Sequence, residues 1–588
     1  MYLLVLIGQL ILLWKGRLLM KASDYIVEFL IKNGITDVFG YPGGMVTHIM
    51  DSLGGYKDKI STHITYHEQG ASFAACGYAQ ITNKPGVAFA TSGPGATNLI
   101  TGIANAFFDS IPCIFITGQV NTYESKGDLS VRQKGFQETD IISMVKGITN
   151  YSAYISSKDD LQYHLEKAYF YTTHGRPGPA VLDIPMDIQR QDISSDISNY
   201  FIPNIIDKTN YYDISDEILD HINNSKRPCI LVGSAVHSSN SVEKLNKFIN
   251  SLNIPVVSSM IATDAVDNKD LYYGFIGAYG HRCANFIINK SDCILTLGSR
   301  LDIRQIGAEP NNFAPNAKLL RIDIDSGELS KHVKSNEFTY NIDLYKLLNI
   351  ISENKFDKSR FNDWRHICKN IKDKLKDIDN QPANTMIQKI SELIPETSII
   401  TTDVGQNQVW VAQSFSTKKN RMLYSGGHGA MGYSLPAAIG ACYGAKRSPV
   451  FAFMGDGGLQ MNIQELQVIS RDKLPIKIIL LNNNSLGMIR HFQEMYFESK
   501  YHFTKTETGY SNPDFQKISD AYGIPYFSIL NVDEIENIKE DLYKLTPSFI
   551  ECKLSDNTFV FPKLSMGKPI HDQDPLLNRS LFEYLSDM

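Results

Sequence analysis

The chain has 588 residues, of which 43% are hydrophobic and 20% are charged, and its net charge is −6. This composition is typical of a globular protein with several domains, and its charge gives no reason to expect nucleic-acid binding. The 8 cysteines are scattered without C-x-x-C spacing, so we expect neither a zinc site nor a disulfide framework, but reduced thiols in a cytoplasmic protein.

The N-terminal segment Met1–Trp14 is apolar, and Lys15 and Arg17 follow it. A signal peptide carries its positive charge before the apolar core, and a membrane-spanning helix needs about 20 apolar residues. Met20 then opens a stretch with the periodicity of an amphipathic helix. We therefore expect translation to start at Met20 and no membrane association. A weak membrane anchor is the alternative.

Residues 20–185 alternate short apolar runs with amphipathic helical patterns, such as Gln69–Gln80 and Ala96–Phe108. Alternating strands and helices predict a parallel sheet that helices cover on both faces. The polar stretch Asp192–Asp213 is typical of a linker. The predicted strands are Asp37–Gly40, His63–Tyr66, Val87–Ala90, Cys113–Thr117 and Ala180–Asp183.

The same alternation returns in residues 205–350 and again in residues 380–555, and a charged stretch, Asn354–Asp379, predicts a helical linker between them. We therefore expect an α/β protein with three doubly wound parallel-sheet domains, followed by residues 556–588 as a tail or lid. The strands expected in the second segment are Cys229–Val232, Pro255–Ser258, Cys293–Leu297 and Leu319–Ile324. Those of the third are Ile399–Thr402, Val450–Met454, Ile476–Leu481 and Phe549–Cys552.

The ends of two predicted strands of the third segment carry oxygen-bearing side chains. Asp456 lies in a glycine-rich turn after one strand, and Asn483 follows the next strand along the chain. Two such side chains can hold one Mg²⁺, which prefers oxygen ligands. Gly457 and Gly458 would let backbone N–H groups approach a diphosphate closely. The pattern therefore predicts a site for Mg²⁺ and a diphosphate.

This interval resembles the diphosphate and metal motif of thiamine diphosphate (ThDP) enzymes. The resemblance implies Asp456 and Asn483 as side-chain ligands of Mg²⁺, and the backbone carbonyl of Ser485 as a third ligand. Such enzymes activate the cofactor with a carboxyl group at N1′ of its aminopyrimidine. Glu68, where a predicted strand gives way to a helix, matches that position and is the expected catalytic carboxylate.

From Met20 onward the chain resembles the catalytic large subunit of the acetolactate synthase family. The resemblance implies decarboxylation of pyruvate to hydroxyethyl-ThDP, followed by transfer of the two-carbon unit to a second 2-keto acid, as in branched-chain amino acid biosynthesis. It also implies that the three domains bind the pyrimidine, a nucleotide such as FAD, and the diphosphate. The motifs that carry it are Phe39–Gly44, Thr91–Asn98, Asp109–Pro112, Thr117–Val120, Phe136–Glu138, Asp403–Gln406, Gly429–Gly432, Leu435–Gly440 and Gln460–Leu466.

The family assigns further roles to matching positions. The diphosphate would be contacted by Val404, Gly405 and Gln406. The carbonyl of Gly429 would accept from the 4′-amino group, and Met431 would support the bent cofactor.

Three positions of the central domain, Arg300, Asp323 and Asp325, resemble family positions that bind FAD. Gln119 and Phe136 of the first domain would line the substrate pocket.

Because Glu68 and Asp456 lie in different domains, we expect sites between subunits of a homodimer or homotetramer. A separate regulatory subunit is a further expected partner. A non-catalytic homologue would be expected to have lost Glu68 or the metal ligands, and both remain.

The acceptor side departs from the family pattern, with Phe492 where a tryptophan is usual. Lys126, Arg132 and Lys134 lie in a longer charged loop. One alternative is therefore a nucleotide-linked keto sugar as the acceptor, in cell-surface polysaccharide synthesis. Another is a simple 2-keto acid decarboxylase.

Overall fold

The computed structural model describes residues 19–194, 199–205 and 207–588. The chain forms two compact units, one ending at residue 205 and the other beginning at residue 206. The apolar segment Met1–Trp14 lies outside the described residues, so the expectations about the translation start and a membrane anchor stay predictions. Across the described ranges, every helix is too short or too polar to cross a membrane.

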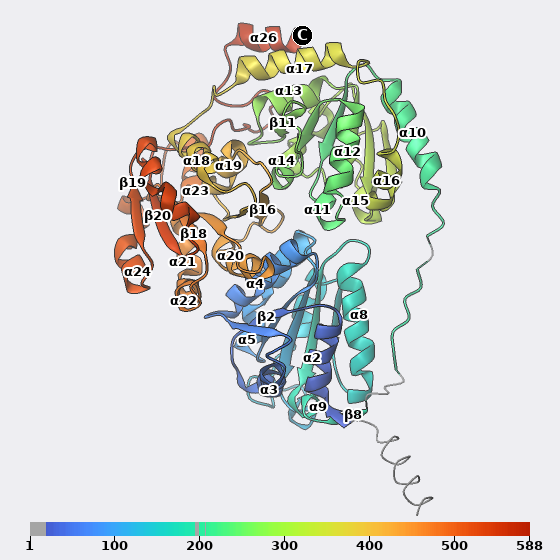
Figure 1. Cartoon of the computed structure of the whole chain (residues 1–588), viewed down its shortest axis with the longest axis vertical. Coiled ribbons are helices and arrows are strands. Elements are labelled where there is room, and N and C mark those ends of the chain that lie inside the picture. The colour runs from blue at the N-terminus through green and yellow to red at the C-terminus, as the bar shows by residue number, and fades with distance from the viewer. Residues whose placement is uncertain (1–18, 195–198, 206) are drawn as a thin grey trace, which may run out of the picture. The chain divides into compact units, whose positions relative to one another are not determined.

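The first unit contains a six-stranded parallel sheet in the order β3-β2-β4-β5-β7-β6 (Figure 1). Its strands are β2 (Asp37–Gly40), β3 (Ser61–Ile64), β4 (Gly86–Ala90), β5 (Cys113–Gln119), β6 (Tyr151–Tyr154) and β7 (Pro179–Pro185). A short antiparallel pair joins β1 (Leu19–Lys21) to β8 (Asp192–Ser194).

Helices cover both faces of this sheet. One face packs against α2 (Ala22–Lys32), α3 (Thr47–Gly55) and α8 (Leu161–Thr173), whose apolar residues form one core with the strands. Another helix, α4 (Glu68–Thr82), packs on β4 and against α6 (Ile100–Phe108). The shorter helices are α5 (Pro94–Asn98), α7 (Ile141–Val145) and α9 (Met186–Gln189).

The second unit contains two more six-stranded parallel sheets. The central sheet has the order β11-β10-β9-β12-β13-β14. Its strands are β9 (Pro228–Val232), β10 (Val256–Ser258), β11 (Tyr272–Phe275), β12 (Cys293–Leu297), β13 (Lys318–Asp323) and β14 (Glu337–Asn341). The C-terminal sheet has the order β16-β15-β17-β18-β20-β19. Its strands are β15 (Ile399–Thr402), β16 (Arg421–Tyr424), β17 (Val450–Gly455), β18 (Ile476–Asn482), β19 (Tyr526–Ile529) and β20 (Ser548–Lys553).

Both sheets of the second unit are covered by helices on two faces, so the predicted fold class of three doubly wound parallel sheets is confirmed. The helices around the central sheet are α10 (Tyr211–Asn223), α11 (Ala235–Ser238), α12 (Val242–Leu252), α13 (Arg282–Lys290), α14 (Ile303–Ile306), α15 (Ser326–Ser330), α16 (Leu344–Ile351) and α17 (Asn362–Leu375). Those that follow are α18 (Pro382–Leu393), α19 (Gln406–Ser414), α20 (Ser434–Gly444), α21 (Asp456–Met461), α22 (Leu466–Arg471), α23 (Gly487–Tyr496), α24 (Phe515–Ala521), α25 (Lys539–Tyr543) and α26 (Arg579–Asp587).

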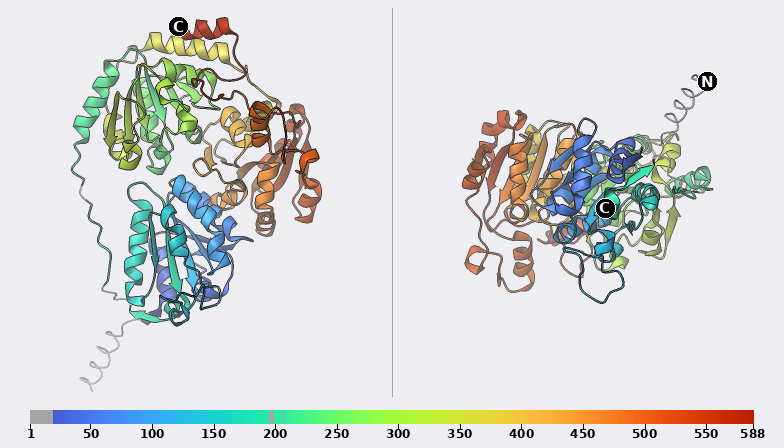
Figure 2. Two further views of the ribbon diagram at one scale, coloured as in Figure 1. Left: turned by 180° about the vertical axis from the view of Figure 1, so that it is seen from behind. Right: turned by 90° about the horizontal axis from the view of Figure 1, so that it is seen from below.

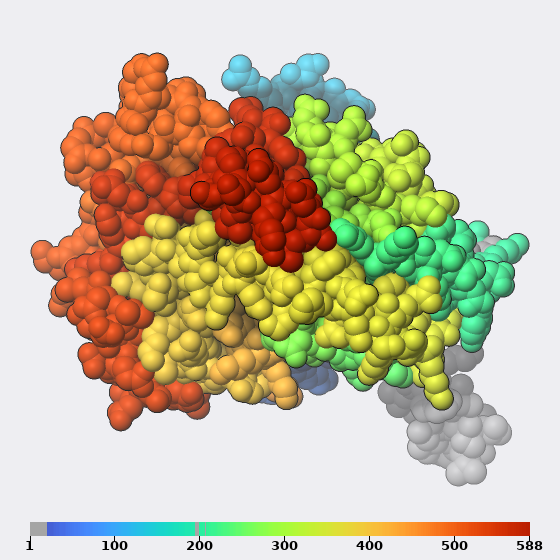
Figure 3. Space-filling model, turned by 90° about the horizontal axis from the view of Figure 1, so that it is seen from above, coloured from blue at the N-terminus to red at the C-terminus, as the bar shows by residue number. Residues whose placement is uncertain are grey.

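The C-terminal segment packs on the central sheet. Helix α26 lies beside α17 in Figure 1 and in the left view of Figure 2, and in the space-filling view the red segment rests against the yellow one (Figure 3). Ile570, Leu577 and Leu585 are buried in the same core as the apolar face of α17. Arg282 donates to the carbonyl oxygens of Gln573 and Pro575. This end of the predicted tail or lid is therefore part of the packed structure, and the predicted domain boundaries stay predictions.

One predicted strand is misplaced. His63–Tyr66 was expected, whereas β3 ends at Ile64. The chain leaves the sheet there because His67 is the N-cap of α4, and its Nδ1 accepts a hydrogen bond from the Gln69 N–H at 3.0 Å. The predicted helix Ala96–Phe108 is divided into α5 and α6.

Candidate active site

The C-terminal sheet has a crevice where its strand order reverses. From β15 the chain crosses to β16 on one side, and β17 and β18 follow on the other side. The loops after β15 and β17 therefore diverge, which is where doubly wound sheets bind ligands. A cavity of about 360 Å³ lies there. It is lined by Tyr279, Arg304, Val404–Gln408, Trp410, Met431, Gly455–Gly458, Leu481, Asn483 and Ser485–Ile489.

Asp456 is the charged centre of this cavity and is 3% exposed. Its Oδ1 accepts from the Gly457 N–H at 3.1 Å, and its Oδ2 accepts from the Ser485 N–H at 3.1 Å and from Nδ2 of Asn512 at 2.6 Å. Burial raises the pKa of this carboxyl, against the lowering effect of these hydrogen bonds. The Tyr510 hydroxyl also lies against this carboxylate and lowers its pKa. The buried carboxylate therefore presents negative charge to the cavity, held in place by the backbone and by Asn512.

The other two predicted metal ligands lie beside Asp456. Asn483 donates from Nδ2 to Oε1 of Gln406 at 2.9 Å, so its amide oxygen is the atom that suits a cation. The carbonyl oxygen of Ser485 accepts from the Gly487 N–H at 2.8 Å and has a second lone pair. The structure thus brings the three predicted ligands to one cavity wall.

Three glycines of the cavity, Gly457, Gly458 and Gly487, are required by close packing. A Cβ on Gly458 would lie 2.6 Å from Oδ1 of Asp403, and one on Gly487 would lie 1.8 Å from Oε1 of Gln406. Gly405 has a φ of 135°, which glycine adopts readily. The backbone can therefore approach a ligand where any side chain would fill the space.

The remaining predicted cofactor contacts divide into two groups. Val404, Gly405, Gln406 and Met431 line the cavity, whereas Gly429, with a φ of 71°, lies outside its lining. Within the part of the chain that the structure describes, the buried Nε2 of Gln406 has no hydrogen-bond partner. An unused donor beside a glycine cradle and a carboxylate fits a diphosphate with its metal ion.

Glu68 begins α4 in the first unit. Its Oε2 accepts from Nδ2 of Asn98 at 2.9 Å, and a Cβ on Gly95 would lie 3.2 Å from its Oε1. Asn98 and Gly95 belong to α5, which follows the end of β4. The carboxylate is therefore held at the carboxyl edge of the first sheet, next to the point where the strand order reverses between β2 and β4.

The two predicted substrate residues of the first unit differ in their surroundings. The Phe136 side chain is 78% exposed. Gln119 is buried, and its Nε2 donates to Oδ2 of Asp183 at 2.9 Å and to the Thr139 carbonyl at 2.8 Å. Its Oε1 accepts from the Val120 N–H at 3.0 Å, so both ends of the amide are held by the protein itself.

Asp183 was not anticipated from the sequence. Burial raises the pKa of its carboxyl to about 7, and the hydrogen bonds from Thr117 and Gln119 lower it in part. The Thr117 hydroxyl donates to Asp183 Oδ1 at 2.6 Å. A carboxylate inside an apolar predicted strand is the signal that could have identified it.

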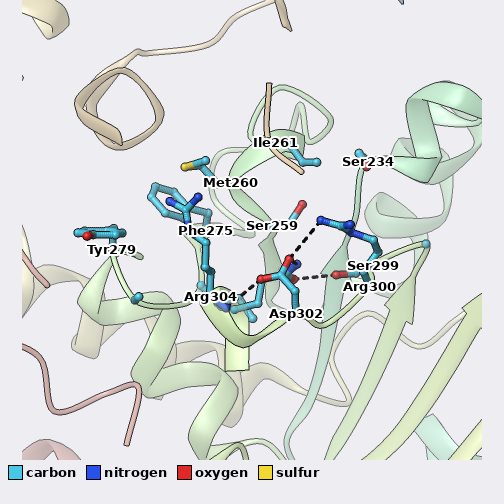
Figure 4. A pocket seen from close by; sticks show the side chains of 15 residues that line it. Ser234, Ser259, Met260, Ile261, Phe275, Tyr279, Ser299, Arg300, Asp302 and Arg304 are labelled. Carbon is cyan, nitrogen blue, oxygen red and sulfur yellow. Dashed lines mark hydrogen bonds and ion pairs between the residues drawn. The ribbon is translucent and has the colours of Figure 1, made fainter. Parts of the chain in front are cut away.

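The central sheet has its own crevice, between β9 and β12, where its order reverses. A cavity of about 60 Å³ lies there and includes Arg300, whose guanidinium faces Asp302 at 3.7 Å (Figure 4). Within the described residues the buried Ser259 hydroxyl at this cavity has no partner. Asp325 caps α15, and Asp323 accepts from the Asp325 N–H. Arg300 lines this cavity, whereas Asp323 and Asp325 lie outside its lining.

Sequence reasoning also missed several residues around the main cavity. Tyr279 and Arg304 come from the central sheet and line both cavities. Asn512 comes from a long segment after α23 and reaches Asp456. No local pattern marks Asn512, because only the fold brings it to the site.

Comparison with known proteins agrees with this geometry. Profiles of the thiamine pyrophosphate enzymes match in three places: the N-terminal TPP binding domain at residues 20–144, the central domain at 215–348 and the C-terminal TPP binding domain at 403–552. Together with the three doubly wound sheets, these matches define a ThDP-dependent enzyme.

Full-length relatives narrow the class. The chain is 35% identical over 561 residues to the acetolactate synthase large subunit of Lactococcus lactis subsp. lactis, which covers 93% of this chain and 95% of that protein. It is 34% identical over 558 residues to the acetolactate synthase isozyme 2 large subunit of Escherichia coli, covering 93% and 98%. For the chloroplastic acetolactate synthase 2 of Nicotiana tabacum the identity is 35% over 578 residues, covering 94% and 85%. The chain belongs to the acetolactate synthase large-subunit family, as its motifs predicted.

Proposed function

We propose that this protein is a Mg²⁺-dependent and ThDP-dependent carboligase that decarboxylates pyruvate and joins the two-carbon unit to a second 2-keto acid. The observation that supports this most is the buried Asp456 carboxylate, which shares one cavity with Asn483 and Ser485 beside a glycine cradle. Family membership supplies the reaction class. With pyruvate as donor and acceptor, the product is acetolactate.

The chain's own residues have distinct tasks in this proposal. When bound, ThDP supplies the carbanion that attacks the keto carbon. Glu68 would exchange a proton with the aminopyrimidine through Oε1, while Asn98 keeps Oε2 in place. Met431, which lines the cavity, would support the bound cofactor, and the family resemblance assigns the Gly429 carbonyl as an acceptor for its amino group.

The metal and diphosphate would be held by the wall of the main cavity. Asp456, Asn483 and Ser485 offer three oxygen atoms to Mg²⁺, which suits its preference for hard ligands. The unused amide of Gln406 is a donor for a phosphate oxygen. The backbone at Val404 and Gly405 lines the same cavity.

FAD is proposed for the crevice of the central sheet. Arg300 offers a guanidinium, which binds phosphate groups well, and the partnerless Ser259 hydroxyl offers a further polar contact. Asp323 ends the strand next to β12, and Asp325 follows it. Their carboxylates would accept from ribose or adenine groups at the sheet edge.

The acceptor proposed is a 2-keto acid, and the contacts of the charged loop favour it over a nucleotide-linked sugar. Lys134 donates from Nζ to the Tyr123 carbonyl at 2.8 Å, and Lys126 donates to the Val131 carbonyl at 3.5 Å. The carboxylate of Glu138 accepts from the N–H groups of Lys126 and Lys134, which folds the loop on itself. These two lysines are therefore engaged in shaping the loop.

A homodimer or homotetramer with sites between subunits is the proposed assembly, because Glu68 and Asp456 lie in different units of the chain. The relatives are named large subunits, which supports a regulatory subunit as a further partner. We also keep the proposal of a cytoplasmic protein with reduced thiols.

The test is purified protein with Mg²⁺, ThDP, FAD and pyruvate alone, with pyruvate loss and acetolactate both measured. We expect one acetolactate for two pyruvates, and a loss of about 10²- to 10⁴-fold in kcat for Glu68→Gln, because a proton-transferring group is removed. Pyruvate loss without acetolactate would contradict the proposed acceptor, and keto-sugar nucleotides would be tried next. Acetaldehyde as the main product would indicate a simple decarboxylase.

A further inference from the structure

The Asp456 carboxylate has a side-chain partner that comes from outside the strand ends. Asn512 belongs to residues 497–514, the segment between α23 and α24. Its Nδ2 lies 2.6 Å from Oδ2 of Asp456 and 3.1 Å from Oδ1 of both Asn482 and Asn484. One amide group therefore contacts the ends of both β17 and β18, the two strands that carry the proposed metal ligands.

The orientation of this amide is fixed by a second residue. Oδ1 of Asn512 accepts from Nε2 of Gln460 at 3.1 Å, and the same Nε2 lies 3.2 Å from the Asp456 carbonyl. A glutamine donor at the oxygen side leaves only the nitrogen of Asn512 to face the carboxylate. Gln460 thus holds Asn512 as a donor toward Asp456.

We propose that Asn512 is a positioning residue that holds the Asp456 carboxylate in the orientation required for the divalent cation. This inference rests on the proposed function, in which Asp456 is a metal ligand. With the Ser485 N–H, Asn512 occupies Oδ2 of Asp456, while Oδ1 accepts only the Gly457 N–H among these three donors. The cation is thereby directed to Oδ1. Hydrogen bonds to a ligating carboxylate orient it and tune its affinity.

Besides Asn512, other hydrogen bonds also connect the segment 497–514 to the end of β18. Nδ2 of Asn484 lies 3.2 Å from Oγ1 of Thr506, and the Ser485 hydroxyl donates to the Thr504 carbonyl at 2.9 Å. The Leu486 N–H donates to the same carbonyl at 3.2 Å. Cation binding at Asp456 should therefore also protect this segment from proteolysis.

The experiment compares Mn²⁺ binding in the full-length protein with ThDP present, measured by electron paramagnetic resonance. Asn512→Leu removes the donor at similar volume, and we expect about 10- to 100-fold weaker Mn²⁺ binding, as for other residues that orient metal ligands. Gln460→Met frees the amide without touching the carboxylate oxygens and should weaken binding less, in the same direction. Thr506→Val is the matched control, because it loosens the segment and leaves Asp456 alone.

A second readout separates positioning from folding. Trypsin cleavage at Lys500 and Lys505 should slow when Mn²⁺ is added to the wild type, and slow less in Asn512→Leu. Unchanged Mn²⁺ affinity in a folded Asn512→Leu would overturn the inference while leaving the metal site intact. If that variant does not fold, unchanged affinity in Gln460→Met overturns it. No Mn²⁺ binding by the wild type would overturn both the inference and the proposed metal site.

Discussion

Gly458 packs closely against the buried Asp403 carboxylate in the proposed diphosphate cradle, and replacing it with alanine tests the cradle directly. The new Cβ would lie 2.6 Å from Oδ1 and 2.8 Å from Cγ of Asp403, well inside ordinary contact at 3.4 Å. Asp403 is 1% exposed, and its carboxylate accepts from the N–H groups of Gly432 and Ser434 at 3.0 Å each. Relief of the clash therefore moves the turn that carries Met431.

The expected loss of ThDP binding free energy is derived from two contributions. Overpacking a buried site costs about 1–3 kcal/mol, and a hydrogen bond to a charged group contributes about 1.5–3 kcal/mol. If the turn moves in the free protein and must return when the cofactor binds, the cost falls on binding. We expect a loss of about 2 kcal/mol, or roughly 30-fold weaker ThDP binding.

The assay titrates the cofactor-free Gly458→Ala protein with ThDP at a fixed Mg²⁺ concentration. Calorimetry measures the binding affinity, and the melting temperature reports stability. The matched control is Gly455→Ala in the same turn, because its Cβ would meet nothing closer than Asn407 Nδ2 at 3.5 Å. The control should bind as the wild type does. Wild-type affinity together with a wild-type melting temperature for Gly458→Ala would refute the reasoning.

Three further predictions concern burial and charge. The pKa of Asp183 is raised from 3.8 to about 7, so the folded protein holds a proton that the unfolded chain releases, and stability falls as pH rises toward 7 by at most about 1.4 kcal/mol per pH unit. Asp183→Asn should lack this part of the slope in melting curves from pH 4 to 8, and equal slopes would contradict it. Arg282→Met leaves the partly buried Asp379 carboxylate without its partner at 2.7 Å and should cost at most about 3–5 kcal/mol in urea unfolding, whereas a loss below about 1 kcal/mol would count against it. Leu585→Ala should cost about 2–5 kcal/mol of unfolding free energy if α26 is part of the core, and a neutral result would mean that the tail detaches readily.

The strands that the sequence failed to predict share a position in the fold. Tyr151–Tyr154, Tyr272–Phe275, Glu337–Asn341, Arg421–Tyr424 and Tyr526–Ile529 all form edge strands of their sheets. The misplaced strand at His63–Tyr66 is also at an edge. Central parallel strands are buried on both faces and appear as continuous apolar runs, whereas edge strands carry polar residues and lack that signal.

The residues of the candidate site also differ in how far a local sequence pattern could predict them. Asp456, Asn483 and the glycines could be predicted because one short segment after each strand carries them. Asn512 could not, because it reaches Asp456 across 56 residues of chain, and nothing local marks it. Gln119 was expected at the substrate, and its hydrogen bonds to Asp183 and Thr139 depend on long-range pairing that a linear motif does not express.

The topology gives a physical reason to expect that the proposed cofactor-binding residues tolerate fewer substitutions than the residues proposed near the acceptor. Next to its first strand (β2, β9 or β15), each six-stranded sheet has a point where the chain changes from one side of the sheet to the other. The loops beside that point carry the residues proposed to bind diphosphate, nucleotide and pyrimidine. Those residues are fixed by strand ends and by close packing such as that at Gly458, so few substitutions are compatible with them. Phe492 and the segment around Lys126 lie on a helix surface and in a loop, where exposed side chains can change without disturbing a sheet. Specificity for the acceptor is therefore the property that this fold can alter at least cost in stability.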